Sequence, residues 1–266
     1  MEYALHHGRW PWHLEKWYFD TLTPGGDVLI VLLAGIRLCG LWRGRVTAEL
    51  YPAGRAPIKG DAAAARVEGG LDRLSFGPAR IDGERFTFET PGLSGDLRVV
   101  PRFPPATARD PLFSVGATRL GWTMEVPDAD TSGELRWPGG SLAVQGRGYR
   151  DRVWTDILPW RIPLLTVRWG RAAAAEHATS WMDAETTAER FRTRWADGVF
   201  VASDPPALRE GRTLFSMRVA DMEALSLGAL GSVLRRMIDP HQTRWAARAT
   251  LDGCEGWAVH EEVRWR

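Results

Sequence analysis

The chain has 266 residues, with 34 lysines and arginines against 33 aspartates and glutamates, and a formal net charge of +1. This length can bury a large core and accommodates one sizeable domain or two of ordinary size. The apolar fraction of 44% and the charged fraction of 25% exclude a disordered or fibrous chain. The balanced charge provides no excess of basic residues for binding nucleic acid.

The N-terminal stretch "MEYALHHGRWPWHLEKW" (1–17) has no basic start followed by an apolar run, so we expect no signal peptide and a cytoplasmic protein. His6, His7, His13 and Glu15 raise the question of a metal site, because histidine and carboxylate ligands bind divalent cations. Their spacing, however, fits neither a pair on one helix face nor a known zinc finger. We therefore expect no metal, and a hydrogen-bonded role for His13 or Glu15 near the start of a strand.

The apolar run "VLIVLLAGI" (28–36) is too short to span a bilayer and predicts a buried strand. After it, glycine and proline interrupt the sequence about every eight to twelve residues. Between the interruptions, short runs alternate between apolar and polar residues, so that Phe86 and Phe88 share one face, as do Leu97 and Val99. Short strands at regular spacing predict an antiparallel β-barrel or β-sandwich.

Two segments have helical character. Residues 183–195 have it weakly, and a turn followed by a strand is the alternative. In residues 220–240, apolar residues recur at helical spacing and two arginines precede a proline, which predicts one short helix. This helix would either cover a cavity as a lid or pack on the outside of a barrel. The Pro- and Gly-rich stretch 127–140 is the best candidate boundary, and we predict two domains, 1–135 and 136–266.

The segment "VQGRGYRDRVWTD" (144–156) carries the residues with the clearest chemical potential. In an extended strand, Tyr149 and Asp151 point to one side, and Arg150 and Arg152 point to the other. A carboxyl group buried beside a phenol would lose solvation, which raises its pKa and suits a general acid. The alternative is a surface carboxylate that pairs with a neighbouring arginine, and the segment alone leaves both readings open.

Other chemical motifs are missing from the sequence. It contains no G-x-S-x-G elbow, no Gly-rich phosphate loop before a helix, and no nucleotide, flavin or haem motif, so we expect no cofactor. Cys39 and Cys254 form no disulfide or metal-binding pattern. His177 is either a base or a hydrogen-bonded histidine in a strand. The fourteen tryptophans suit a packed core and the lining of a ligand cavity equally well.

Three motifs together resemble a known family. "EKWYFD" (15–20) resembles the E-W-W-Y-F-D signature of proteins related to hydroxyneurosporene synthase, the carotenoid 1,2-hydratase, a family that includes lipocalin-like cyclases. Residues 121–156 follow its second signature, which ends in G-x-G-Y-H-D-H-N-W-G. "VRWGRA" (167–172) matches the W-G-R-A that usually follows, and the ending "HEEVRWR" (260–266) also fits. The chain departs from the second signature where R-D-R-V-W-T (150–155) replaces H-D-H-N-W-G.

The resemblance implies an all-β protein with two lipocalin-like antiparallel β-barrel domains in tandem. A hydrophobic polyene or isoprenoid would bind in a barrel or between the domains, without a metal or an organic cofactor. Asp151 would donate a proton to a carbon–carbon double bond, with Tyr149 as its hydrogen-bond partner, while Arg150 and Arg152 would orient the strand or bridge the domains. The residues expected to bind substrate are Trp122, Trp17, Tyr18, Met124, Trp154, Trp169 and His177.

Three functions remain open at this stage. The first is a hydratase or cyclase of terpenoid or polyene substrates, as in carotenoid biosynthesis or secondary metabolism, that works by proton-initiated chemistry. The second is a pericyclic cyclase of the Diels–Alder type, which needs no obligatory acid. The third is a non-catalytic carrier of a lipid or pigment. In each case the partner is a hydrophobic small molecule, peripheral contact with a membrane is compatible with the sequence, and the oligomeric state is not determined by it.

Overall fold

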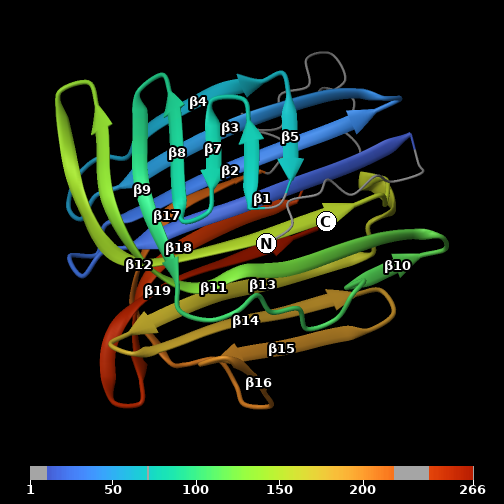
Figure 1. The fold of residues 1–266 in the computed structure, drawn as a ribbon. Helices are drawn as coiled ribbons and strands as arrows, with labels where there is room; N and C mark the ends of the chain where they lie inside the picture. Colours follow the sequence, from blue (N-terminus) through green and yellow to red (C-terminus); the bar gives the residue numbers. More distant parts are fainter. Residues whose placement is uncertain (1–10, 71, 219–239, 266) are drawn as a thin grey trace. The chain divides into compact units, whose positions relative to one another are not determined.

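The computed structural model describes residues 11–70, 72–218 and 240–265, and most of them lie in antiparallel strands (Figure 1). The chain divides into two compact units, Met1–Leu158 and Pro159–Arg266. The sequence-based boundary at 135/136 falls within the hairpin of β11 (Thr118–Trp137) and β12 (Gly140–Thr155). These two strands are hydrogen-bonded along their length, and the chain reaches the second unit only after β12.

The first unit contains one sheet of twelve strands. Its other strands are β1 (Trp12–Leu22), β2 (Val28–Leu38), β3 (Leu41–Tyr51), β4 (Ile58–Ala64), β5 (Val67–Gly70), β6 (Arg73–Phe76), β7 (Ala79–Asp82), β8 (Arg85–Thr90), β9 (Leu93–Pro101) and β10 (Phe113–Val115). The strand order is β4-β3-β2-β1-β12-β11-β9-β8-β7-β6-β5, and β10 pairs with β11. β1 therefore lies beside β12, although the two are far apart in the sequence.

The sheet of the first unit curls until it is nearly closed. β4 packs close to the turn between β8 and β9, where a Cβ atom on Gly60 would lie 2.5 Å from the Pro91 carbonyl oxygen and 3.0 Å from the Leu93 nitrogen. Only glycine permits this approach, because any larger residue would push the two segments apart. The curled sheet has the form of a lipocalin-like barrel.

The core of the first unit lies inside the curl and follows the predicted alternation. Phe86 and Phe88 are both buried, with ring centroids 5.7 Å apart, and Leu97 and Val99 are buried on the next strand. The apolar run 28–36 forms most of β2 and is buried, as predicted. Within the described ranges, no helix has the length and apolar character needed to cross a membrane.

The second unit contains a sheet of seven strands and a short 3-10 helix, η1 (Pro159–Arg161). Its strands are β13 (Leu164–Ala174), β14 (His177–Thr186), β15 (Arg190–Ala196), β16 (Val199–Val201), β17 (Leu208–Arg218), β18 (His241–Leu251) and β19 (Cys254–Arg264), in the order β16-β15-β14-β13-β19-β18-β17. The prediction of an all-β protein with two antiparallel β units is confirmed.

The two segments predicted to have helical character have different outcomes. Residues 183–195 form the end of β14, a turn and then β15, so the turn-plus-strand alternative is correct. The Thr186 hydroxyl stabilises this turn, because it accepts hydrogen bonds from the backbone N–H groups of Ala188 and Glu189 at 3.1 and 2.8 Å. The helix predicted over 220–240 falls almost entirely on residues 219–239, which lie outside the described residues.

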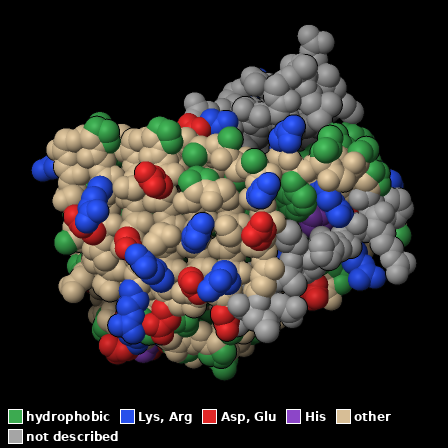
Figure 2. Space-filling view, turned by 45° about the horizontal axis from the view of Figure 1, so that its top comes forward, with side chains coloured by type: hydrophobic (Ala, Val, Ile, Leu, Met, Phe, Trp, Pro, Cys, Tyr) green, Lys and Arg blue, Asp and Glu red, His purple; other side chains and the backbone are tan. Residues whose placement is uncertain are grey.

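Charged side chains of both signs are interspersed on the face shown in Figure 2, rather than gathered by sign. Exposed ion pairs of the first unit include Arg85 with Asp96, at 2.6 Å, and Arg98 with Glu84, at 3.0 Å. The surface charge shown is therefore locally compensated.

Candidate active site

Three adjacent strands, β1, β12 and β11, carry the residues that the sequence singled out. Because side chains alternate along a strand, these strands have two faces. One face carries Trp17 and Phe19 and belongs to the packed core; we call it the core face. The other, which we call the site face, carries Tyr18 and Asp20 from β1, Tyr149 and Asp151 from β12, and Trp122 and Met124 from β11.

Asp151 is held on the site face by two hydrogen-bond donors. The Tyr149 hydroxyl and the Trp122 indole N–H each donate to its Oδ2 atom at 3.0 Å. All three residues are buried, with Asp151 only 5% exposed. Hydrogen bonds donated to Oδ2 stabilise a negative charge on the carboxyl group, whereas burial disfavours that charge.

A second Tyr–Asp pair lies directly beside the first and was missed by the sequence analysis. The Tyr18 hydroxyl donates to Asp20 Oδ2 at 2.7 Å, and Asp20 is fully buried. In the β1–β12 register, Tyr18 lies opposite Asp151 and Asp20 lies opposite Tyr149, and the two tyrosine rings are 6.2 Å apart. The signal was present in the sequence as the spacing Tyr-x-Asp, which occurs at 18–20 and again at 149–151.

Arg150 and Arg152, which replace the histidines of the family signature, point to the core face. Arg152 donates through Nε to Glu15 Oε1 at 2.6 Å, and its guanidinium lies 5.0 Å from the centre of the Trp17 ring. Arg150 donates through Nε to Glu125 Oε2 at 3.0 Å. All four charged side chains are buried. Each arginine thus has a carboxylate partner on the face opposite Asp151.

His13 joins the buried charges of the core face. Its Nδ1 atom is 2.7 Å from Asp156 Oδ1, and its Nε2 atom is 3.5 Å from Glu15 Oε2. Burial opposes the protonation of His13, but the hydrogen bonds to Glu15 and Asp156 outweigh burial and raise its pKa. His13 and Glu15 are therefore hydrogen-bonded residues of a strand, as expected. His6 and His7 lie outside the described residues, among which no three metal-binding side chains cluster.

Two of the expected substrate-binding residues of the first unit are on the core face. The Trp17 ring packs edge-on against Phe76 at 6.0 Å within the core. Trp154 covers Gly121, where a Cβ atom would overlap its indole ring. Strand alternation separates both tryptophans from Asp151. Tyr18, Met124 and Trp122, by contrast, share the site face with it.

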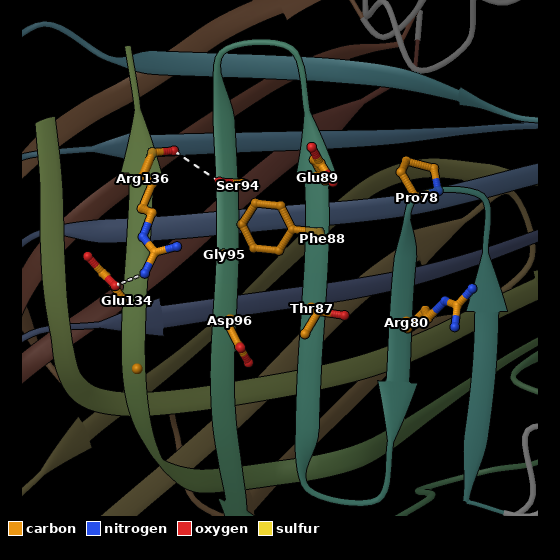
Figure 3. Close-up of a pocket in the computed structure, with 11 residues that line it drawn as sticks. Pro78, Arg80, Thr87, Phe88, Glu89, Ser94, Gly95, Asp96, Glu134 and Arg136 are labelled. Atoms are coloured by element: carbon orange, nitrogen blue, oxygen red, sulfur yellow. Dashed lines mark hydrogen bonds and ion pairs between the residues drawn. The ribbon is translucent and has the colours of Figure 1, made fainter. Parts of the chain in front are cut away.

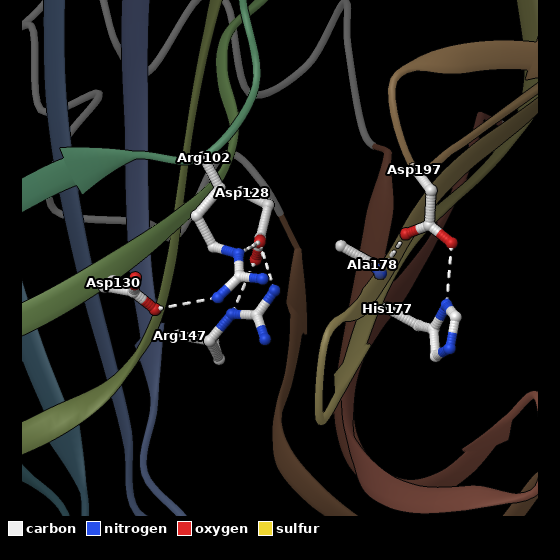
Figure 4. A network of polar contacts seen from close by, with 7 residues as sticks. All are labelled: Arg102, Asp128, Asp130, Arg147, His177, Ala178 and Asp197. Atoms are coloured by element: carbon white, nitrogen blue, oxygen red, sulfur yellow. Dashed lines mark hydrogen bonds and ion pairs between the residues drawn. The ribbon is translucent and has the colours of Figure 1, made fainter.

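The second unit holds the remaining two expected residues. Trp169 is buried on β13. His177 begins β14, and its side chain is 34% exposed. Its Nδ1 atom is 2.9 Å from Asp197 Oδ2, and the other carboxylate oxygen of Asp197 accepts a hydrogen bond from the Ala178 N–H at 2.7 Å (Figure 4). The hydrogen bond to Asp197 raises the pKa of His177. His177 is thus anchored at a hairpin.

A further buried carboxylate lies near the site face in the first unit. Asp128, which is fully buried, is bound by Arg147 Nε at 3.1 Å and by Arg102 Nε at 3.3 Å, and Arg102 also contacts Asp130 (Figure 4). Two guanidinium groups on one carboxylate hold it in its charged form. This cluster ties β11 and β12 to the segment after β9, so its role is structural.

Two cavities formed by described residues lie elsewhere in the first unit. One, of about 670 Å³, is formed by β7, β8, β9 and β11 and is lined by charged side chains that include Arg80, Glu89 and Arg136 (Figure 3). Its polar lining does not suit a hydrophobic ligand, whose sites are mostly apolar. The other, of about 350 Å³, lies between β3, β4 and the β11–β12 hairpin and includes Ile58 and Trp137.

Comparison with known proteins extends the fold assignment. No protein-family model and no curated protein matches the sequence. Among solved structures, a Nitrosomonas europaea protein provisionally described as AttH is similar, with a TM-score of 0.63 and 14% identity over 98% of this chain and 94% of that one. CghA in complex with Sch210972 gives a TM-score of 0.64 at 13% identity, covering 96% and 89% of the two chains.

Kievitone hydratase from Nectria haematococca is also similar, with a TM-score of 0.55 and 11% identity over 94% of this chain and 88% of that one. Each likeness extends over nearly the whole of both chains, which includes both β units. At these identities it establishes the fold. The prediction of a lipocalin-like fold from three motifs is therefore confirmed, whereas the hydroxyneurosporene synthase family remains a resemblance.

Proposed function

We propose that this protein is an enzyme that hydrates or cyclises an alkene-rich hydrophobic substrate, with Asp151 as the proton donor. The observation that carries the proposal is the geometry of Asp151, a buried carboxyl group. Its Oδ2 atom accepts one hydrogen bond from the Tyr149 hydroxyl and one from the Trp122 N–H, each at 3.0 Å. Burial disfavours the charged form of a carboxyl group, and this keeps an acid protonated near neutral pH.

The two donors also assist the proton transfer. When Asp151 gives its proton to a double-bond carbon, negative charge develops on its carboxylate. The N–H of Trp122 and the hydroxyl of Tyr149 are already in place to stabilise that charge without reorganisation. The carbocation formed on the neighbouring carbon is stabilised by the faces of nearby aromatic rings, of which Tyr18 and Trp122 are the candidates.

The arginines of the altered signature do not oppose this chemistry. A guanidinium next to Asp151 would stabilise its ionised form and weaken it as an acid. Arg150 and Arg152 are instead paired with Glu125 and Glu15 on the core face. A further support is the shared fold with a protein that is by name a hydratase. A terpenoid or polyene remains the substrate class proposed from the sequence motifs.

The test is the incorporation of deuterium. A hexane extract of carotenoid-producing cells is incubated with the protein in D₂O and analysed by mass spectrometry. Wild type is expected to form a product with one carbon-bound deuterium, and Asp151→Asn to form it about 100 to 10,000 times more slowly, which is the usual contribution of a general acid. Asp130→Asn, which changes a largely exposed aspartate of β11, is the matched control.

Other outcomes identify other functions. A cyclised product without deuterium would indicate a pericyclic cyclase, because a pericyclic reaction adds no proton from solvent. A bound compound that returns unchanged from wild type would indicate a carrier. Full turnover by Asp151→Asn would contradict the role of Asp151.

A further inference from the structure

We propose that the turn between β2 and β3 inserts into the interface of a bilayer that contains anionic phospholipids. Residues 37–43, which form this turn and its flanks, are called the β2–β3 tip. Two observations on the tip carry the proposal, the exposure of its leucines and the arginines on either side of them. Binding of this kind goes beyond the proposed function and does not depend on it.

The β2–β3 tip is a tight hairpin that holds two leucines in the solvent. Leu38 and Leu41 lie directly opposite each other, and Leu38 is 39% exposed while Leu41 is 67% exposed. The turn between them is Cys39 and Gly40, with φ angles of 49° and 83°, as a two-residue hairpin turn requires. Because opposite residues of a hairpin share a face, the two leucine side chains form one apolar projection.

The tip is anchored to the unit behind it. The half-buried ring of Trp42 covers Gly35, where a Cβ atom would overlap the ring, and it meets the His13 ring edge-on at a centroid distance of 6.5 Å. The backbone N–H of Cys39 donates a hydrogen bond to the Pro11 carbonyl oxygen at 2.7 Å. The two leucines are therefore presented on a held turn, with an aromatic ring at its base.

Positive charge flanks the apolar projection. Arg37 and Arg43 lie on either side of the two leucines, and the stretch 28–48 contains no aspartate or glutamate. Arg43 is exposed, and its guanidinium donates to a backbone carbonyl, which leaves its positive charge in place. Arg45, further along β3, is paired with Asp61 instead. Exposed apolar side chains beside positive charge match a surface of anionic headgroups over hydrocarbon.

A bilayer fits this projection better than a protein partner does. A stable protein interface buries about 800 Å² per partner, and a turn with two leucines offers far less. A bilayer has no fixed shape, so a convex tip can enter it. The two strands are hydrogen-bonded to each other up to the turn, so few backbone polar groups lose water on insertion. Trp42 and the arginine side chains suit the headgroup level above the hydrocarbon.

A second exposed apolar turn has different charges beside it. Val199 and Phe200, which are 60% and 44% exposed, follow the turn between β15 and β16. Asp197 lies in that turn, and Asp204 follows the strand. Carboxylates are repelled by an anionic surface, so we expect no insertion there. Val199→Asp is therefore a matched control for Leu41→Asp, because both place a carboxylate on an exposed apolar position beside a turn.

The test is co-sedimentation of the whole protein with lipid vesicles. One set of vesicles contains phosphatidylcholine alone, and the other also contains phosphatidylglycerol, which is anionic. Wild type should bind the anionic vesicles at least about five-fold more tightly, which is the contribution of one arginine near such a surface. Leu41→Asp should weaken this binding at least about ten-fold, because it removes apolar area and adds a repelled charge. Arg43→Gln should weaken it about five-fold and leave binding to the neutral vesicles unchanged.

Several results would overturn the inference. One is a wild type that does not sediment with the anionic vesicles, and another is a Leu41→Asp variant that binds them as wild type does. A loss in Val199→Asp as large as in Leu41→Asp would show that the effect is not specific to the tip. If Leu41→Asp instead abolishes a dimer in analytical ultracentrifugation and leaves vesicle binding unchanged, the tip is a contact between two copies of the chain.

A second measurement decides the matter if Leu41→Asp fails to fold. Cys39 is exposed and free, so in a Cys254→Ser background it can carry an environment-sensitive fluorophore. The emission should shift to the blue when the anionic vesicles are added, and an unchanged emission contradicts insertion of the tip. None of these measurements uses turnover, so a failure of the role of Asp151 leaves their outcome unaffected.

Discussion

Replacing Arg152 by methionine should destabilise the first unit by about 3 kcal/mol or more. Glu15 has no solvent exposure, and Arg152 is 6% exposed. Removing one partner of a buried ion pair leaves an uncompensated charge, which costs about 3–5 kcal/mol. His13, 3.5 Å from Glu15, retains part of the compensation and places the loss near the lower end of that range. The contact of the guanidinium with the Trp17 ring is lost as well.

The assay is hydrogen exchange of β1 and β12 peptides in increasing urea, which reports the unfolding free energy of the unit to which they belong. Arg85→Met is the matched control, because the Arg85–Asp96 pair is exposed and such pairs contribute little. The double variant Glu15→Met/Arg152→Met should be more stable than Arg152→Met, since it removes both charges.

Two results would refute this reasoning about the core face. One is a loss of stability in Arg152→Met no greater than in Arg85→Met. The other is a double variant less stable than Arg152→Met alone. Either would mean that Arg152 and Glu15 are not a buried pair, and the argument that the arginine is directed away from Asp151 would lose its basis.

Further predictions concern titration and close packing. The stability that His13 contributes, measured against His13→Gln, should be complete below its ordinary pKa of 6.5 and should disappear as the pH rises through its raised folded-state pKa. Burial lowers the pKa of His260, so its NMR titration midpoint should lie below 6.5, and its unfavourable effect on stability should appear only as the pH falls below that value. Gly146→Ala places a Cβ atom against the Leu22 carbonyl oxygen and should cost about 1–3 kcal/mol in urea unfolding, whereas Gly70→Ala, with open space around it, should have little effect.

The sequence predicts much of the local structure because strand alternation is a local property. The burial of Phe86 with Phe88, and the common direction of Tyr149 and Asp151, both follow from a period of two. Domain organisation is harder to infer from the same signals. Residues 127–140 contain register irregularities of β11 and the β11–β12 turn, and proline and glycine mark such features as readily as they mark a linker.

The candidate site could be predicted only in part, because half of it depends on which strands pair. Tyr149 and Asp151 lie in one motif, so alternation alone relates them. Asp20 enters the site only through the β1–β12 register, which joins residues about 130 positions apart. The same register decides that Arg152 meets Glu15. Periodicity cannot supply this information, although the repeated Tyr-x-Asp spacing could have suggested it.

The two signature motifs, distant in sequence, form a single structural unit. Glu15 begins the first motif and neutralises Arg152 of the second on the core face. Asp20 ends the first motif and lies opposite Tyr149 of the second on the site face. Successive residues of one strand serve both faces, so Arg152, where the similar signature has histidine, is compensated by Glu15 of the neighbouring strand. The charge of Arg152 therefore belongs to the core face, and the Tyr–Asp pairs lie on the site face.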